Sequence, residues 1–118
     1  MEIKNEFFLA DFDRDKKCVT VRLCGEIDHH SAVAIRREID EMILRDRPEK
    51  LILDLGTVDF MDSSGLGLIM GRYSLACELG GRTVIRNAGE RTMKILTLAG
   101  LDKIITIEKN TKTERNRS

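Results

Sequence analysis

"KLILDLGTVDFMDSSGLGLIMGRY", residues 50–73, joins an apolar strand pattern directly to an apolar helix pattern. Its first part, "KLILDLG", is a short and nearly continuous apolar run, which is typical of a strand covered on both faces. Its second part predicts a helix that ends at the pair Gly80-Gly81. The helix is predicted from side chains that recur at helical spacing: Leu66, Ile69, Met70, Tyr73, Ala76 and Cys77.

The residues before this segment predict further strands and a helix. Residues 17–26, "KCVTVRLCGE", alternate with the period of a strand, and an earlier strand is expected within residues 3–11, with a turn at "DRDKK". From Ser31 to Arg45 the period is helical, and the only proline of the chain, Pro48, lies just beyond. The apolar stripe of this helix consists of Ala32, Ile35, Ile39, Met42 and Ile43.

The residues after the segment continue the alternation. "RTVIRNA" predicts a strand, "ERTMKILTLAG" a helix that ends at Gly100, and "KIITI" a last strand. Asn87, with Glu90 three places later, resembles the start of that helix. Strands thus alternate with helices after a hairpin-like pair. This predicts an α/β domain whose mixed sheet of about five strands is antiparallel at first and parallel where helices cross over.

Length and composition bound the possible functions. The 118 residues are enough for one domain, of which 1–107 are expected to fold and 108–118 to form a charged, solvated tail. No apolar run approaches the ~20 residues of a membrane span, and the polar start is unlike a signal peptide, so a cytoplasmic protein is expected. The net charge is zero, which gives nucleic-acid binding no electrostatic support.

The charges are nevertheless unevenly distributed. Residues 25–62 contain ten acidic and five basic side chains, whereas residues 63–118 contain five acidic and ten basic ones. This asymmetry either favours a basic partner or arises by chance. The cysteines at 18, 24 and 77 lack metal-type spacing and are expected to be inert reduced thiols.

The two serines of "MDSSGLG" raise the question of catalysis. A nucleophile elbow requires G-x-S-x-G, and here Phe60 and Met61 stand where the first glycine belongs. The only histidines, His29 and His30, come before the serines and are interpreted as surface residues at a helix start. A metal-binding set is also missing. The sequence therefore predicts no enzyme.

Two other interpretations of this segment involve phosphate. Glycines at 65, 67 and 71 follow a strand, but their G-x-G-x-x-x-G spacing is not that of a dinucleotide fingerprint, no P-loop lysine follows, and close helix packing explains 67 and 71 equally well. Asp54 ends the predicted strand, as the phosphoacceptor of a response-regulator receiver would, yet no early acidic pair accompanies it. No cofactor is predicted.

The simplest interpretation is a helix cap at Asp62 or Ser63, which contributes about 1 kcal/mol. A cap needs one residue, however, whereas this segment supplies three hydroxyl or carboxyl groups in a row. A phosphate on a serine at a helix start would lie close to backbone N–H groups and to the positive end of the helix dipole. A cap and a modified serine thus remain compatible.

Four segments carry a resemblance to a known family. "GEIDHHSA", "DLGTVDFMDSSGLGLIMGRY", "LGGRTVI" and "ILTLAGL" resemble the anti-sigma factor antagonists of the STAS domain family, in particular its sporulation branch. The match spans roughly residues 17–107, and "MDSSGLG" is its most specific part. The resemblance implies a mixed sheet with helices mainly on one face.

The resemblance also implies a function. Such a domain binds an anti-sigma factor that is also a serine kinase, and thereby releases the sigma factor. The kinase phosphorylates the serine after the aspartate, here Ser63, and a PP2C-type phosphatase removes the phosphate. The further positions expected to contact the partner are Asp28, Asp62, Ser64, Gly65 and Gly67. For Asp28 the alternative is that it only caps the first helix. A STAS scaffolding module of a stress-signalling complex is the alternative.

Overall fold

The computed structural model describes residues 2–108, which form a six-stranded mixed sheet with three α-helices. The strands lie in chain order: β1 (Glu2–Lys4), β2 (Phe8–Asp13), β3 (Cys18–Ile27), β4 (Lys50–Met61), β5 (Arg82–Arg86) and β6 (Thr106–Glu108). The pairs β1·β2 and β2·β3 are antiparallel and the remaining three are parallel. The helices are α1 (His29–Asp46), α2 (Ser63–Glu78) and α3 (Glu90–Leu98), followed by a 3₁₀ turn, Leu101–Lys103. The expected α/β fold is confirmed.

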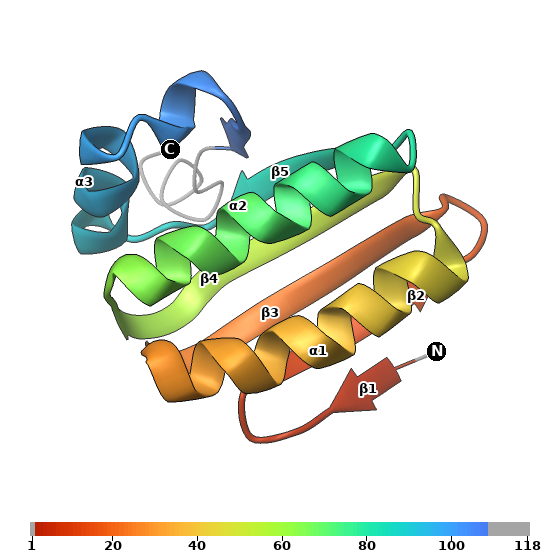
Figure 1. Cartoon of the computed structure of the whole chain (residues 1–118), viewed down its shortest axis with the longest axis horizontal. Helices are drawn as coiled ribbons and strands as arrows, with labels where there is room; N and C mark the ends of the chain where they lie inside the picture. The colour runs from red at the N-terminus through yellow and green to blue at the C-terminus, as the bar shows by residue number, and fades with distance from the viewer. Residues whose placement is uncertain (1, 109–118) are drawn as a thin grey trace, which may run out of the picture.

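Helices α1 and α2 lie side by side across one face of the sheet (Figure 1). Helix α3 follows β5 in the chain and lies beyond the end of that strand. The core fills the space between these two helices and the central strands. Val21 of β3 and Leu53 of β4 are register partners, and both are almost completely buried there. The whole predicted stripe of α1 is buried, which confirms the face assigned from its spacing.

Strand β4 is longer than its sequence pattern predicts. Its five residues 51–55 are all buried, as expected, but the strand continues past Gly56 to Met61. Its pairing with β3 shifts register twice, and at each shift β4 holds one residue more than β3. Bulges of this kind bend a strand and change the direction in which the chain continues. They carry β4 on to the residues that start α2.

The N-terminal segment holds two strands where one was predicted. Asn5 separates them: its side-chain oxygen accepts hydrogen bonds from the backbone N–H groups of Phe7 and Phe8 at 2.8 and 2.9 Å. Its own N–H donates to the Phe8 carbonyl oxygen at 3.0 Å. An asparagine turn of this type reverses the chain within a few residues, so β1 folds back on β2.

Helix α2 buries most of the face that its apolar residues predict, and more besides. Ile69 and Ala76 of that face are buried and Leu66, Met70 and Tyr73 are partly buried, whereas Cys77 is exposed. Leu68 and Arg72, which lie outside the predicted face, are also buried. The helix packs against both the sheet and α1, so its buried surface is wide. The packing explanation of Gly67 and Gly71 was wrong, because a Cβ atom at either position would meet no neighbouring atom within 4 Å.

The C-terminal part requires two corrections. Helix α3 begins at Glu90 as expected, but its N-cap is Gly89 and not Asn87. Asn87 instead has a left-handed backbone, with φ of 61°, and its side chain faces β4. Residue 108, assigned to the tail, is the last residue of β6, where its carboxylate accepts a hydrogen bond from Arg86 at 2.8 Å. The rest of the predicted tail, 109–118, lies outside the described residues.

Candidate functional site: the paired helix starts at the carboxyl edge of the sheet

Strands β3 and β4 end together, and a helix starts immediately after each. Ile27 and Met61 are the last register partners of the two strands. The next residues, Asp28 and Asp62, are the N-caps of α1 and α2. The backbone N–H of Asp62 donates to the carbonyl oxygen of Ile27 at 3.2 Å, which holds the two helix starts together. The parallel register therefore brings together two aspartates that are far apart in the sequence.

Asp62 is the cap of α2, which decides between the two candidates for that role. Its carboxylate accepts a hydrogen bond from the backbone N–H of Ser64 at 2.8 Å, and its carbonyl oxygen accepts one from the N–H of Gly65 at 3.0 Å. Ser63 is the first residue of the helix and is exposed. Its hydroxyl makes no hydrogen bond within residues 2–108, so capping leaves this hydroxyl open to solvent.

Asp28 forms a reciprocal cap with Ser31. Its carboxylate accepts from the Ser31 N–H at 2.9 Å, and its own N–H donates to the Ser31 hydroxyl at 3.0 Å. The hydrogen bond from the Ser31 N–H is the main reason why the pKa of Asp28 lies below its usual 3.8, and the neighbouring His30 lowers it further. Asp28 thus caps its helix as an anion and adds negative charge beside α2.

The two glycines assigned to partner contact have different surroundings. A Cβ atom at Gly65 would overlap the side chain of Met61 and lie 3.3 Å from Ile27, so this glycine allows α2 to start close to the ends of β3 and β4. Gly67 is exposed, and the space above it is open. Gly65 therefore serves packing, whereas Gly67 leaves a stretch of helix backbone uncovered.

A hollow of about 250 Å³ lies between the first turns of α1 and α2. From α2 it is lined by Ser64, Gly67 and Leu68, and from α1 by His29, Ala32, Val33 and Arg36. The sequence patterns do not indicate a binding role for Val33 or Arg36. The sequence does contain one sign of a contact surface here, because Val33 is a large apolar residue outside the predicted stripe. In the structure Val33 is 46% exposed.

Charges of both signs lie around the helix starts. Asp28 and Asp62 are the N-caps of α1 and α2, and Arg36 lines the hollow between the two helices. Glu26 and Asp59, which precede the capping aspartates in the chain, are exposed. Neither histidine hydrogen-bonds to Ser63 or Ser64 within the described part of the chain. Within residues 2–108, these serines thus lack the hydrogen-bonded histidine of a Ser-His-Asp hydrolase.

The structure also tests the receiver hypothesis for Asp54. This residue lies inside β4 and its side chain is only 7% exposed. One carboxylate oxygen accepts from the Gly56 N–H at 2.8 Å and the other from the side-chain amide of Asn87 at 3.1 Å. Asp54 therefore holds the bulge of β4 to the end of β5, which is a structural role.

Two further properties bear on the class of protein. Within residues 2–108, no cluster of three histidine, cysteine, aspartate or glutamate side chains is suited to hold a metal ion. No helix in this range combines the length and the apolar character that a membrane crossing requires.

Comparison with known proteins identifies the family. The model of the STAS domain matches residues 10–114. The anti-sigma F factor antagonist of Paenibacillus polymyxa is 38% identical over 100 residues, which are 85% of this chain and 86% of that protein. The anti-sigma-B factor antagonist of Bacillus subtilis is 31% identical, over 83% of this chain and 88% of the relative. This chain belongs to the STAS domain family.

Solved structures agree with this assignment. The anti-sigma factor antagonist SpoIIAA in its unphosphorylated form superposes with a TM-score of 0.70 at 28% identity, over 93% of this chain and 94% of that one. SpoIIAA of Bacillus in its phosphorylated form gives a TM-score of 0.69, also at 28% identity, over 94% of this chain and 99% of that one. The resemblance stated from "MDSSGLG" is confirmed at the level of the family and the fold.

Proposed function

We propose that this chain is an anti-sigma factor antagonist, whose partner is an anti-sigma factor that also acts as a serine kinase. The carrying observation is the exposed hydroxyl of Ser63, at the first position of a helix whose capping is done by Asp62. The relatives named as anti-sigma factor antagonists, and one solved in a phosphorylated form, support this assignment. The domain itself has no turnover, and it acts in the cytoplasm, where sigma factors work.

Phosphorylation of Ser63 is the proposed off-switch, and its effect is explained by charge. A phosphoserine adds about −1.5 to −2 charges at pH 7. Asp62 adjoins Ser63 in the chain, and Asp28 caps the neighbouring helix. A partner that covers Ser63 must remove the phosphate and these carboxylates from water together, which strengthens their repulsion. Two unit charges 4 Å apart interact by about 4 kcal/mol at an effective dielectric of 20. A loss of about 3 kcal/mol already weakens binding more than a hundredfold.

The partner contact we propose centres on the hollow between α1 and α2. Ser64 and Gly67 line it, and the exposed backbone at Gly67 allows another chain to approach closely. A glycine inside a helix costs about 1 kcal/mol relative to alanine, and no packing contact at Gly67 compensates for this. Its place beside Ser63 supports a role in binding. Asp28, Asp62 and Gly65 then shape the surface from below, and a PP2C-type phosphatase restores it by removing the phosphate.

The proposal is tested by phosphorylation in vitro. The purified anti-sigma factor of the same organism, incubated with this chain and ATP, should add one phosphate, which fragmentation mass spectrometry should place on Ser63. Ser63→Ala should block the reaction and retain binding, whereas Ser63→Asp should weaken binding by less than the phosphate does. Ser64→Ala is the matched control and should be phosphorylated normally, because Ser64 is half-buried behind the cap. Phosphate on Ser64, or undiminished binding by Ser63→Asp, would overturn the mechanism.

A further inference from the structure

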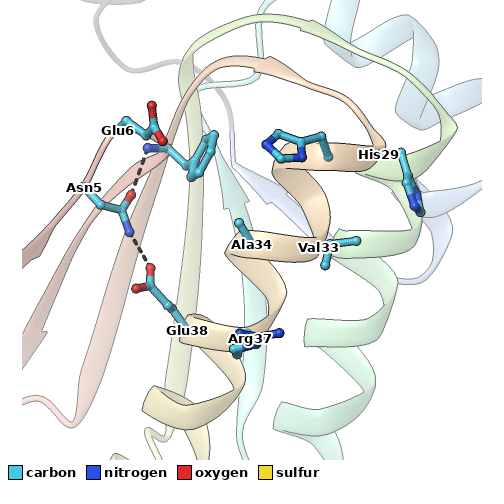
Figure 2. A pocket seen from close by; sticks show the side chains of 9 residues that line it. Asn5, Glu6, His29, Val33, Ala34, Arg37 and Glu38 are labelled. Atoms are coloured by element: carbon cyan, nitrogen blue, oxygen red, sulfur yellow. Dashed lines mark hydrogen bonds between the residues drawn. The ribbon is translucent and has the colours of Figure 1, made fainter.

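A second and larger hollow, of about 620 Å³, lies between the turn that joins β1 to β2 and the first half of α1 (Figure 2). Its apolar walls include Phe7, Val33 and Ala34. Charged side chains border it, with Glu6 on the turn and Arg37 on the helix. It therefore combines apolar and charged side chains, as the surfaces of protein contacts do.

Two sets of contacts hold the walls of this hollow in place. The side chain of Asn5 accepts hydrogen bonds from two backbone N–H groups of its own turn. It also donates to the carboxylate of Glu38 on α1, and Figure 2 marks this hydrogen bond. The ring of Phe7 lies edge-on to that of His30, with centroids 6.4 Å apart. The turn is thus fixed to the helix, and a partner would find the hollow already formed.

The second hollow adjoins the hollow beside Ser63. His29 and Val33 line both of them. In Figure 2 the labelled side chains of His29 and Val33 point to the side of α1 that carries α2. Two consecutive arginines lie in different hollows: Arg36 lines the smaller one and Arg37 the larger one. The exposed Val33 is the ridge between them.

The size of a protein interface requires more surface than the smaller hollow offers. Seven residues line that hollow, whereas a stable interface takes roughly 20–30 residues and about 800 Å² from each partner. A partner seated on Ser63 must therefore extend over neighbouring surface. The larger hollow lies immediately beside it, across Val33, and Phe7, Val33 and Ala34 give it apolar walls.

We infer that the protein which covers Ser63 also inserts an apolar side chain into the hollow between α1 and the β1–β2 turn. The occupant is the anti-sigma factor, so this inference rests on the proposed function. A buried anchor in a preformed pocket is where binding energy concentrates in protein interfaces. The hollow then supplies affinity that does not depend on Ser63, while the charge on Ser63 decides whether the complex persists.

The test uses variants that fill the hollow or reverse a charge at it, and that leave the residues around Ser63 unchanged. Ala34→Leu adds apolar atoms to its wall, and Ser74→Leu makes a comparable addition on an exposed position of α2 outside both hollows. Arg37→Glu reverses a charge at the hollow, and Arg45→Glu makes the same exchange further along α1. Binding of the anti-sigma factor is measured by calorimetry, and circular dichroism checks each variant's fold.

Ala34→Leu and Arg37→Glu should each weaken binding at least tenfold, and the two controls less than twofold. Arg37→Glu keeps the test decisive if Ala34→Leu folds poorly, because Arg37 is exposed. Parent-like affinity of Ala34→Leu or Arg37→Glu, alongside a weakened Ser63→Asp, would overturn this inference and leave the proposed function intact. A parent chain that neither binds the anti-sigma factor nor accepts phosphate from it would overturn both.

Discussion

The backbone N–H of Asp62 donates to the carbonyl oxygen of Ile27 at 3.2 Å, so the start of α2 is bonded to the end of β3. Asp62 also caps its own helix through the N–H of Ser64. A single residue thus fixes where Ser63 lies relative to both central strands. The exposed serine thus lies at a junction of strand and helix that backbone hydrogen bonds hold in place, which suits recognition by an enzyme that must reach one hydroxyl.

The first prediction separates two properties of Asp62, its hydrogen bond as the cap of α2 and its negative charge. Asp62→Ala removes the cap and should lower the free energy of unfolding by about 1 kcal/mol. Asp62→Asn keeps an oxygen that can accept from Ser64, so its stability should stay within a few tenths of a kcal/mol of the parent. Urea unfolding followed by circular dichroism measures both.

The same pair of variants tests the electrostatic part of the switch. With Asn at position 62, the phosphate on Ser63 no longer adjoins a carboxylate. Phosphorylation should then weaken binding of the anti-sigma factor less than it does in the parent. Asp62→Ala unfolding at the parent's urea midpoint would contradict the assignment of Asp62 as the cap.

The second prediction concerns pH and Asp28. Its pKa is lower in the folded chain than the usual 3.8, chiefly through the Ser31 N–H. A group with a depressed folded pKa contributes stability above its unfolded pKa, and this contribution is lost as the pH falls through the folded value. Melting temperatures between pH 7 and 3 should therefore fall less steeply below about pH 4 for Asp28→Asn than for the parent. Parallel curves for the two proteins would exclude this role of Asp28.

The sequence was sufficient for the parts of the fold that repeat a period. The stripe of α1, from Ala32 to Ile43, is buried as predicted because one side of the helix faces the sheet. The pattern is incomplete for α2, which also buries Leu68 and the charged Arg72, because this helix meets α1 as well as the sheet. The spacing of apolar residues along a helix indicates one apolar face. It gives no information about a second surface of the helix that contacts another element.

The site was predicted in part, for a related reason. "MDSSGLG" drew attention to Asp62 and Ser63, and a helix cap is a local property that sequence can reveal. The hollow beside them depends on the parallel register of β3 and β4, which brings Val33 and Gly67 together. The bulges in β4 and the asparagine turn at Asn5 likewise arise from contacts between distant or adjacent backbone groups that no apolar pattern records.

The third prediction tests the ion pair that links α1 to α2. Arg72 Nε lies 2.7 Å from the carboxylate of Asp40, but without hydrogen-bond alignment, and the Arg72 side chain is only 7% exposed. Burial lowers the pKa of Arg72, and the attraction of Asp40 opposes this. Removing the carboxylate would leave a buried cation unpaired.

Asp40→Ala should therefore lower the free energy of unfolding by about 2 kcal/mol. Arg72→Leu should destabilise less, because the Asp40 carboxylate that it leaves behind is 31% exposed and can be hydrated. Denaturant unfolding of the two single variants and of the double variant gives the coupling between them. A larger loss for Arg72→Leu than for Asp40→Ala would contradict this account.

The last prediction uses Gly65 and Gly67, which are two positions apart and differ in what surrounds them. Gly65→Ala places a methyl group against the buried Met61, and overpacking of this kind should lower the free energy of unfolding by about 2 kcal/mol. Gly67→Ala meets no neighbour and replaces glycine within a helix, so it should raise stability by up to about 1 kcal/mol. The midpoint of thermal unfolding should thus move in opposite directions for the same chemical change.

Binding measurements then show whether the surface at Gly67 contacts the partner. Gly67→Val should weaken the anti-sigma factor complex at least tenfold, because its side chain occupies the approach to the helix. Gly71→Val is the control, since the space at Gly71 is equally open and the residue lies outside the hollow beside Ser63. Equal loss of affinity in the two valine variants would show that helix propensity, and not contact with the partner, accounts for the effect.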